Sequence, residues 1–363
     1  MAYQIESENI LDVNDYEDVL EYLPDNSKQY IKNNTYNIRK NIYQEIRRYC
    51  IQKDTNTFVV SLSGGVDSMV IASIIHYLGY NTICIHINYN NRLVSEKESE
   101  FILKWLKYNN ITCIFKNIQE LRRGFINRND YEEQTKNIRF DLYKNTLSNY
   151  PEAKNCIMLG HHKDDVIENI FNNVCRGRNL LDLPVMAMEN EINGVIISRP
   201  MINLFKQEVF DFAHEHNIPY FKNTTPYWCM RGIFRYEIFP LINKSYTNLC
   251  NNLLKIGQQS NEWNQIIEIK VIKPFLDKVE YLDNGFSFCI DGHENMPFSF
   301  WNVVLAKIYH HYKEHCPSNK SINGFIQYIN KYSSKSIKEY KKYKLSNNSI
   351  CTLKDNVLIV DFT

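Results

Sequence analysis

The chain has 363 residues, of which 44% are hydrophobic and 23% are charged, so two to three domains with a sizeable core are available and wholesale disorder is excluded. The 42 Lys and Arg residues almost balance the 41 Asp and Glu residues. The resulting net charge of +1 excludes a uniformly basic surface but allows local basic patches.

No run approaches the roughly 18 apolar residues of a membrane span, and residues 1–13 lack the basic-then-apolar pattern of a signal peptide. The ten cysteines form no C-x-x-C pair, which argues against a disulfide framework or a zinc site. Reduced thiols and a cytoplasmic location are therefore expected.

The first 55 residues combine a polar, acidic segment with a helical pattern at 36–51. From residue 57 onward, short apolar runs alternate with longer amphipathic stretches. The expected strands are 57–62, 82–88, 111–115, 156–160 and 195–198. The expected helices are 67–78, 95–108, 130–147, 164–175 and 205–216, with capping boxes at Ser95/Glu98 and Asp130/Glu133. This alternation predicts an α/β fold with a parallel sheet and helices on both faces.

The alternation ends after about residue 242. Residues 249–269 and 298–312 have helical patterns, and the tail from Ser346 to Phe362 predicts a strand pair. We therefore expect a largely helical N-terminal extension (1–54), a catalytic α/β domain (55–245) and a smaller C-terminal α+β domain (246–363).

The most specific motif is S-L-S-G-G-V-D-S, from Ser61 to Ser68, which joins the first strand of the sheet to its helix. Gly64 and Gly65 permit close backbone approach and conformations that other residues resist. The N–H groups of such a turn converge on an anion, and the hydroxyls of Ser63 and Ser68 add donors. The loop lacks the Lys of a G-x-x-x-x-G-K-[ST] phosphate loop. A purely structural turn is the alternative, and the complete motif favours a nucleotide site over it.

This loop resembles that of the PP-loop ATP pyrophosphatase superfamily. Those enzymes cleave ATP between the α and β phosphates and adenylate a substrate oxygen. The resemblance implies that ATP is bound by Ser63, Gly64, Gly65, Asp67 and Ser68. It also implies a catalytic role for Asp67, as the residue that holds a Mg²⁺ ion between the phosphates.

A second motif, G-H-H-K-D-D-V-I-E-N, begins at Gly160. Asp165 and Glu168 are three residues apart at a helix start, so both carboxylates lie on one face near the positive helix end. A solvated helix start and a di-metal phosphoesterase site are the alternatives. The motif resembles the second signature of tRNA(Ile)-lysidine synthetases and of tRNA 2-thiocytidine enzymes. That resemblance implies a nucleotide contact for His161, and it implies that Asp165 and Glu168 hold the ammonium group of lysine.

Weaker features resemble the lysidine synthetases in part. The run from Glu132 to Phe140 is similar to their E-x-x-x-R-x-x-R-Y helix, which implies that Arg139 holds the lysine carboxylate or a developing charge. A solvated helix face is the alternative. Ligands of open α/β sheets bind outside the carboxyl ends of the strands, so one crevice is expected to collect both motifs and the turn at 86–91. The arginines expected there, in contact with tRNA or the amine, are Arg199, Arg231 and Arg235.

The lysine-rich segment 331–344 is the predicted tRNA contact of the C-terminal part, with a solvated helix face as the alternative. Tyr332, Tyr340 and Tyr343 interleave with its lysines, which suits phosphate contacts combined with stacking on unpaired bases. The element order of the tail resembles the C-terminal domain of lysidine synthetases. The lysines expected to contact tRNA are Lys338, Lys341 and Lys342.

The resemblance therefore predicts an ATP- and Mg²⁺-dependent ligase that adenylates the 2-carbonyl of a tRNA cytidine and joins lysine to it. A homodimer is one expected assembly. A PP-loop enzyme with another nucleophile or acceptor is the first alternative, and Tyr89, Lys136 and Asn223, which depart from the lysidine synthetase pattern, leave it open. The lack of C-x-x-C pairs argues against thiolation. A non-catalytic nucleic-acid-binding relative is the second alternative, against which both intact motifs argue.

Overall fold

The structure is a computed structural model that describes residues 11–12, 14–21, 29–30, 35–90, 92–118, 127–184, 186–222, 225, 230–333 and 342–362. The chain divides into two compact units. The first consists of residues 1–175 and 184–255, and the second of residues 176–183 and 256–363. Each unit has its own sheet and its own hydrophobic core.

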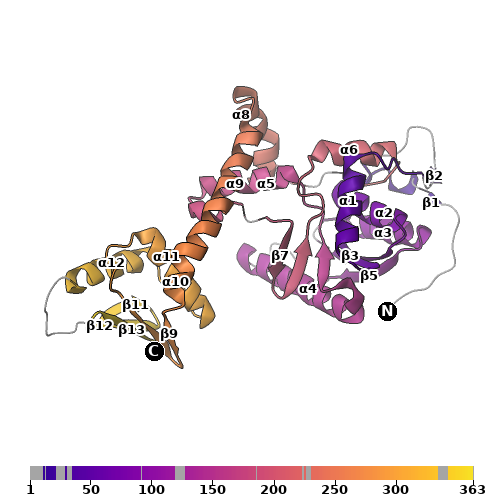
Figure 1. The fold of residues 1–363 in the computed structure, drawn as a ribbon. Helices are drawn as coiled ribbons and strands as arrows, with labels where there is room; N and C mark the ends of the chain where they lie inside the picture. Colours follow the sequence, from indigo (N-terminus) through magenta and orange to yellow (C-terminus); the bar gives the residue numbers. More distant parts are fainter. Residues whose placement is uncertain are drawn as a thin grey trace. The chain divides into compact units, whose positions relative to one another are not determined.

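The main sheet of the first unit has six strands in the order β5-β4-β3-β6-β8-β7 (Figure 1). All neighbours are parallel except β7 and β8, which form an antiparallel hairpin at one edge. The strands are β3 (Thr57–Ser61), β4 (Asn81–Asn88), β5 (Thr112–Asn117), β6 (Cys156–Met158), β7 (Glu189–Ile192) and β8 (Val195–Ser198). The predicted α/β fold is confirmed. The strand β7 is absent from the predicted elements because its sequence, ENEI, has a single apolar residue.

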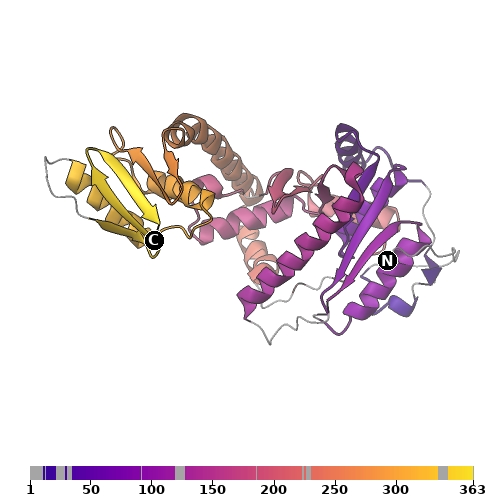
Figure 2. The ribbon, with the colours of Figure 1, turned by 90° about the horizontal axis from the view of Figure 1, so that it is seen from below.

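Helices cover both faces of this sheet because alternate side chains of each strand are buried on opposite sides. On one face, Phe58 and Val60 pack with α1 (Asn41–Gln52), α2 (Val66–Tyr77), α3 (Ser95–Tyr108) and α6 (Lys206–Glu215). On the other face, Val59 packs with Phe140 and Tyr143 of α4 (Arg128–Asn149), the long helix that runs along the strands in Figure 2. The remaining helices of this unit are α5 (Lys163–Cys175), α7 (Met230–Ile233), α8 (Phe239–Ser245) and the first part of α9 (Leu249–Ile267).

The N-terminal residues contribute short elements to the same unit. These are β1 (Leu11–Asp12), which pairs with β2 (Gln29–Tyr30), and the 3-10 helix η1 (Asn14–Tyr16). Tyr16, Val19 and Leu20 lie in the core cluster that also contains Ile46 of α1. The division of function at residue 54 remains a prediction.

The two predicted capping boxes are wrong. Helix α3 has Val94 at its N-cap, and the Ser95 hydroxyl donates to the carbonyl of Arg92 at 2.8 Å from inside the first turn. The Glu98 carboxylate instead pairs with the Arg92 guanidinium at 2.7 Å. Helix α4 begins at Arg128, so Asp130 is a first-turn residue and not a cap. In both helices the chain is already helical where the motif would require an extended residue.

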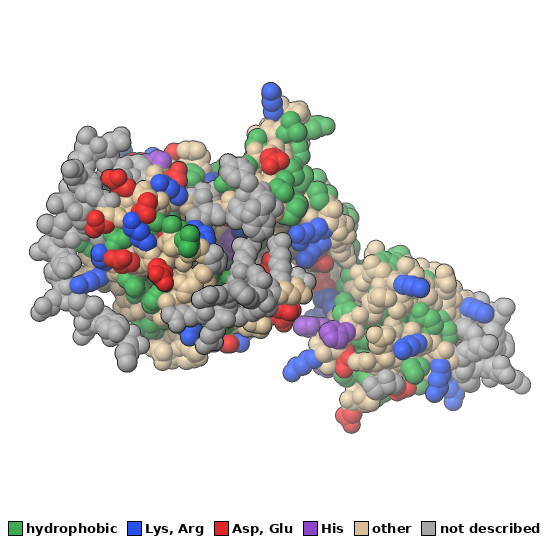
Figure 3. All heavy atoms as spheres, turned by 180° about the vertical axis from the view of Figure 1, so that it is seen from behind, with side chains coloured by type: hydrophobic (Ala, Val, Ile, Leu, Met, Phe, Trp, Pro, Cys, Tyr) green, Lys and Arg blue, Asp and Glu red, His purple; other side chains and the backbone are tan. Residues whose placement is uncertain are grey.

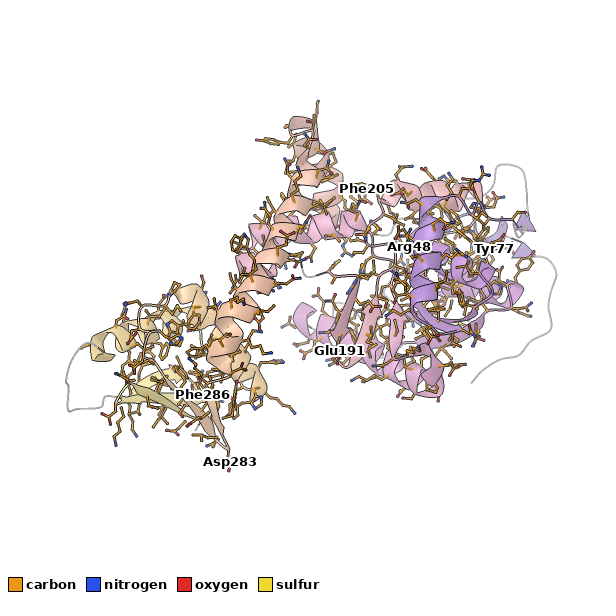
Figure 4. All side chains as sticks on the ribbon, viewed as in Figure 1. Arg48, Tyr77, Glu191, Phe205, Asp283 and Phe286 are labelled. Carbon is orange, nitrogen blue, oxygen red and sulfur yellow. The ribbon has the colours of Figure 1, made fainter. Side chains whose placement is uncertain are left out.

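The second unit contains a five-stranded antiparallel sheet in the order β11-β12-β13-β10-β9. Its strands are β9 (Glu280–Leu282), β10 (Gly285–Cys289), β11 (Tyr343–Ser346), β12 (Ser349–Lys354) and β13 (Val357–Phe362). Trp301 of α11 (Phe298–His311) and Phe325 of α12 (Asn319–Ser333) pack on Phe286, labelled in Figure 4, together with α10 (Lys273–Leu276). The predicted C-terminal strand pair is confirmed as β12 and β13. Among the described residues, no helix combines the length and the apolarity needed to cross a membrane.

Candidate nucleotide site

The two sequence motifs follow the neighbouring strands β3 and β6. From β3 the chain builds β4 and β5 on one side and then returns to β6 on the other side. The carboxyl ends of β3 and β6 therefore flank the point where strand order reverses, which is where ligands of open α/β sheets bind. A pocket of ≈ 670 Å³ opens there, lined by Ser63, Gly65 and Asp67 from the first motif, by His86 near the end of β4 and by Tyr89 just after it.

Hydrogen bonds within the Ser63–Ser68 loop fix its shape. The Ser68 Oγ accepts the N–H of Ser63 at 3.1 Å and donates to the carbonyl of Gly65 at 3.0 Å. Gly64 has a φ of +83°, and a Cβ there would lie 2.1 Å from the ring of Phe221. Gly65 has an ordinary φ of −69°, so only Gly64 needs the conformational freedom expected of both glycines. The loop leads directly into α2, whose first N–H groups suit an anion.

Gly160 of the second motif lets the end of β6 approach the start of α2. A Cβ at Gly160 would lie 2.6 Å from the Cβ of Asp67 and 3.1 Å from the backbone nitrogen of Ser68. The Nε2 of His162 consequently lies 3.8 Å from a carboxylate oxygen of Asp67. Glycine at position 160 therefore allows the two motifs to meet.

Lys206, the first residue of α6, places a cation at the phosphate loop. Its Nζ lies 2.7 and 2.6 Å from the two carboxylate oxygens of Asp67, and its backbone N–H donates to Asp164 at 2.8 Å. It lines the ≈ 670 Å³ pocket and also a pocket of ≈ 230 Å³ that includes Glu168 and Phe234. Lys206 is absent from the predicted site residues. The sequence signal that could have indicated a nearby cation is the excess of carboxylates in the second motif.

Two of the three carboxylates of the second motif, those of Asp165 and Glu168, hold arginines. Glu168 accepts one hydrogen bond from the Nε of Arg231 and one from the Nε of Arg235, both at 2.8 Å. Asp165 accepts a further bond from the Nη2 of Arg235 at 2.9 Å. Both carboxylates are buried. Burial alone would raise the pKa of Asp165, but the nearby His162 and Arg235 outweigh it and hold that pKa below its ordinary value. The structure thus brings Asp165, Glu168, Arg231 and Arg235 into one cluster.

The side chain of the buried Arg199 holds the ring of His161 by a hydrogen bond. The Nε of Arg199 donates to the Nδ1 of His161 at 3.2 Å, and its Nη1 donates to Ala187 and Asn190, both at 2.9 Å. Because Nδ1 accepts this bond, the neutral ring of His161 carries its proton on Nε2. Burial is the main cause that lowers the pKa of His161, so the neutral ring is favoured.

Arg139 lies on α4, near the hydroxyl of Tyr89. Burial raises the pKa of Tyr89, and the Arg139 guanidinium opposes that shift. In the described part of the chain, Arg139 and Arg199 line neither of the two pockets, whereas Tyr89 lines the larger one. The structure therefore places Arg139 close to Tyr89 but outside the lining of both pockets.

The family model for the PP-loop domain matches residues 35–242, which is more than half of the chain. The chain belongs to the PP-loop family. The resemblance recognised in the two motifs is confirmed, and the match includes α1 as well as the strands and helices of the main sheet. Membership of the PP-loop family implies that the protein uses ATP.

Curated relatives are similar at low identity. The chain is 22% identical over 239 residues to the bifunctional protein TilS/HprT of Listeria innocua, but it spans only 36% of that relative's length. It is 24% identical over 306 residues to the tRNA(Ile)-lysidine synthase of Chlamydia muridarum, covering 83% of this chain and 91% of the relative. It is also 24% identical to the Staphylococcus aureus tRNA(Ile)-lysidine synthase, over 76% of this chain and 65% of the relative.

A solved structure supports the same architecture. The U34-tRNA thiolase NcsA from Methanococcus maripaludis, with its [4Fe-4S] cluster, superposes with a TM-score of 0.50 at 18% identity. The superposition covers 64% of this chain and 82% of that chain. This similarity shows the fold of the PP-loop unit.

The lysine-rich segment 331–344, which is predicted to contact tRNA, belongs to the second unit. Lys338 and Lys341 lie outside the described residues, and Lys342 is exposed just before β11. Lysine and arginine side chains are distributed over the face of this unit in Figure 3. Tyr343 stays a predicted stacking partner for an unpaired base. Its hydroxyl donates to the carbonyl of Ser321 at 2.8 Å, and its ring stacks on Tyr328 with centroids 5.5 Å apart, because β11 packs against α12.

The donor set of this PP-loop site is suitable for Mg²⁺ at Asp67. The described residues contain no group of three or more His, Cys, Asp or Glu side chains that could hold a metal ion by themselves. Mg²⁺ at phosphate-transfer sites is usually bound by one or two carboxylates together with substrate phosphates. Asp67 lines the larger pocket and its side chain is 24% exposed, so its carboxylate can supply such a ligand.

Proposed function

We propose that this protein is an ATP-dependent ligase that joins lysine to carbon 2 of a cytidine in tRNA. The observation that carries the proposal is Lys206, which lines both the PP-loop pocket and the smaller pocket with the carboxylate of Glu168. The two pockets are thereby contiguous, which suits a nucleotide in the larger one and a cationic amine in the smaller one. The relatives named tRNA(Ile)-lysidine synthase support tRNA and lysine as the substrates. We also propose a cytoplasmic location and a homodimer.

In the first step, the 2-carbonyl oxygen of the cytidine attacks the α-phosphorus of ATP and pyrophosphate leaves in line. Ser63 and the N–H groups at the start of α2 hold the phosphates, and Ser68 acts by fixing the loop through its bonds with Ser63 and Gly65. Asp67 would hold Mg²⁺, which neutralises phosphate charge when bound. The Nζ of Lys206 lies between the two pockets and stabilises the negative charge that develops on the α-phosphate oxygens. For neutral His161, which lines neither pocket in the described part of the chain, we propose by resemblance to the family's second motif a contact from Nε2 to the nucleotide.

In the second step, an amine of lysine attacks carbon 2 of the adenylated cytidine, and AMP leaves. The smaller pocket has apolar walls at Phe234 and Phe239 and a carboxylate at Glu168, a combination that suits an alkyl chain with an ammonium group. Asp165 and Glu168 hold that ammonium in exchange for the guanidinium of Arg235. For Arg139 we propose, by resemblance to lysidine synthetases, a contact with the lysine carboxylate.

We propose that tRNA is held by cations of both units. In the first unit, Arg231 and Arg235 belong to the cluster with Asp165 and Glu168, and Arg199 acts through His161. In the second unit, the proposed contacts are Lys338, Lys341 and Lys342 of the lysine-rich segment. Phosphate contacts of this kind carry a strong dependence on salt. The salt dependence of tRNA binding should therefore weaken in a variant with Lys342 replaced by alanine.

The direct test is incubation with ATP, labelled lysine and total tRNA, followed by mass spectrometry of the nucleosides. A cytidine whose mass has increased by that of lysine less water is the expected product. Absence of any new nucleoside mass would refute the ligase proposal.

A second candidate is a PP-loop enzyme that uses a different nucleophile. The observation that favours it is the occupation of Asp165 and Glu168 by Arg235 and Arg231, which leaves the acid pair already neutralised by guanidinium groups. The same assay with ammonia, other amino acids or sulfide in place of lysine distinguishes this candidate by the mass that is added to the nucleoside.

Replacement of Lys206 by methionine is predicted to reduce ATP–pyrophosphate exchange about 100-fold, as expected for loss of one donor that stabilises transition-state charge. Methionine keeps the aliphatic chain but removes the cation. Lys206→Arg should retain most of the activity because it keeps the charge. Unchanged exchange in Lys206→Met would show that Lys206 only balances the charge of Asp67.

A further inference from the structure

Residues 16–21, the N-terminal strap, lie outside the family match at 35–242 yet pack into the core beside the nucleotide loop. Tyr16, Val19 and Leu20 are 1%, 3% and 2% exposed, and they share a hydrophobic cluster with Phe221. The strap is also anchored on α3, because the Tyr16 hydroxyl donates to Glu100 at 2.9 Å. The strap lies outside the matched family domain, yet its side chains of Tyr16, Val19 and Leu20 are as buried as those of the core.

Backbone hydrogen bonds connect the strap to the PP-loop through residues 220–222. The N–H of Glu21 donates to the carbonyl of Tyr220 at 3.0 Å, and the N–H of Lys222 donates to the carbonyl of Val19 at 2.9 Å. Leu20 and Phe221 thus form an antiparallel bridge. On its other side, the N–H of Phe221 donates to the carbonyl of Gly64 at 2.9 Å.

The ring of Phe221 fills the space beside Gly64, where any added Cβ would collide with it. Glu21, Tyr220, Phe221 and Lys222 all line the ≈ 670 Å³ pocket, so the strap reaches the pocket wall itself. The strap consequently fixes the backbone of Phe221, and Phe221 supports Gly64, the residue of the phosphate loop with a left-handed conformation. Such supporting contacts hold a binding loop in its productive geometry.

We propose that the N-terminal strap is a positioning part of the nucleotide site, which holds Phe221 and thereby the Gly64 carbonyl where ATP binding requires them. This inference rests on the proposed use of ATP at the PP-loop pocket, and it is independent of lysine and tRNA as substrates. Phe221 is the residue through which the strap acts, and Leu20 is the residue that holds Phe221.

The test compares two Leu→Ala substitutions that each create a cavity in the same hydrophobic core. Leu20→Ala truncates the buried side chain of the residue that pairs with Phe221 in the backbone bridge, whereas Leu106→Ala truncates a leucine of α3 that is 1% exposed in the same cluster. Both variants should lose similar thermal stability because each removes a buried leucine side chain. Only Leu20→Ala should weaken ATP binding by the full chain, by about tenfold in Kd measured by calorimetry, because loosened support misplaces the loop.

A second pair isolates the backbone bridge. Glu21→Pro removes the N–H that donates to Tyr220, while Glu21→Ala keeps it and controls for loss of the carboxylate. The Kd for ATP should rise in the proline variant relative to the alanine variant. Equal values of Kd within both pairs would overturn the strap's role. A wild-type protein that binds ATP but adds no lysine to tRNA would overturn the ligase proposal and leave the strap comparison valid. Failure of the wild type to bind ATP would overturn both.

Discussion

Asp67→Asn is expected to reduce ATP–pyrophosphate exchange at least about 1000-fold, because one substitution removes both the proposed ligand for Mg²⁺ and the negative partner of Lys206. Asparagine preserves the shape of the side chain at the first turn of α2, where Gly160 leaves little space around the Cβ. The measurement is the incorporation of labelled pyrophosphate into ATP. It requires an acceptor tRNA but no amine.

The loss in Asp67→Asn should occur without unfolding. The pair between Asp67 and Lys206 is partly exposed, with side chains that are 24% and 28% accessible, and pairs of this kind contribute about 0–1 kcal/mol to stability. Asp54→Asn serves as the control, since the Asp54 side chain is 99% exposed. The proposed role of Asp67 is wrong if Asp67→Asn exchanges pyrophosphate as fast as Asp54→Asn does.

The sheet and the phosphate loop of this protein could be predicted from its sequence, because both depend on local sequence patterns. Apolar runs such as that at Thr57–Ser61 are short and bounded, and the glycine-rich turn follows directly. The hairpin strand β7 lacks that pattern, since its residues are mainly polar and lie at a sheet edge. Edge strands are defined by backbone pairing, which leaves little trace in the sequence.

The contacts within the site depend instead on tertiary structure. The pairing of Arg235 with Glu168 joins α5 to residues 67 positions later, and the pairing of Lys206 with Asp67 spans 139 positions. Pattern analysis places these residues near the same strand ends, but it carries no information on which charges meet. The support of Gly64 by Phe221 is similar, because nothing in the local sequence of either residue indicates the other.

Glu168→Gln is expected to separate the two half-reactions. Glu168 lines the smaller pocket, whereas Ser63 and Asp67 line the larger one. We therefore expect ATP–pyrophosphate exchange to stay within about threefold of the wild type, while the rate of lysine transfer falls about 100-fold, because the loss is confined to one buried carboxylate. Both rates are measured on the same preparation, with labelled pyrophosphate and with labelled lysine.

The stability of Glu168→Gln decides how its kinetics are interpreted. Breaking a fully buried ion pair costs about 3–5 kcal/mol, but the side chains of Arg231 and Arg235 are 53% and 31% exposed, so solvent takes over part of their interaction and the cost is smaller. Glu191→Gln on β7, labelled in Figure 4, is the control, because Glu191 lies on the exposed edge strand. An equal loss of both half-reactions in Glu168→Gln, with folding intact, would show that this carboxylate organises the nucleotide pocket as well as the amine pocket. In that case the assignment of Glu168 to the lysine ammonium would be wrong.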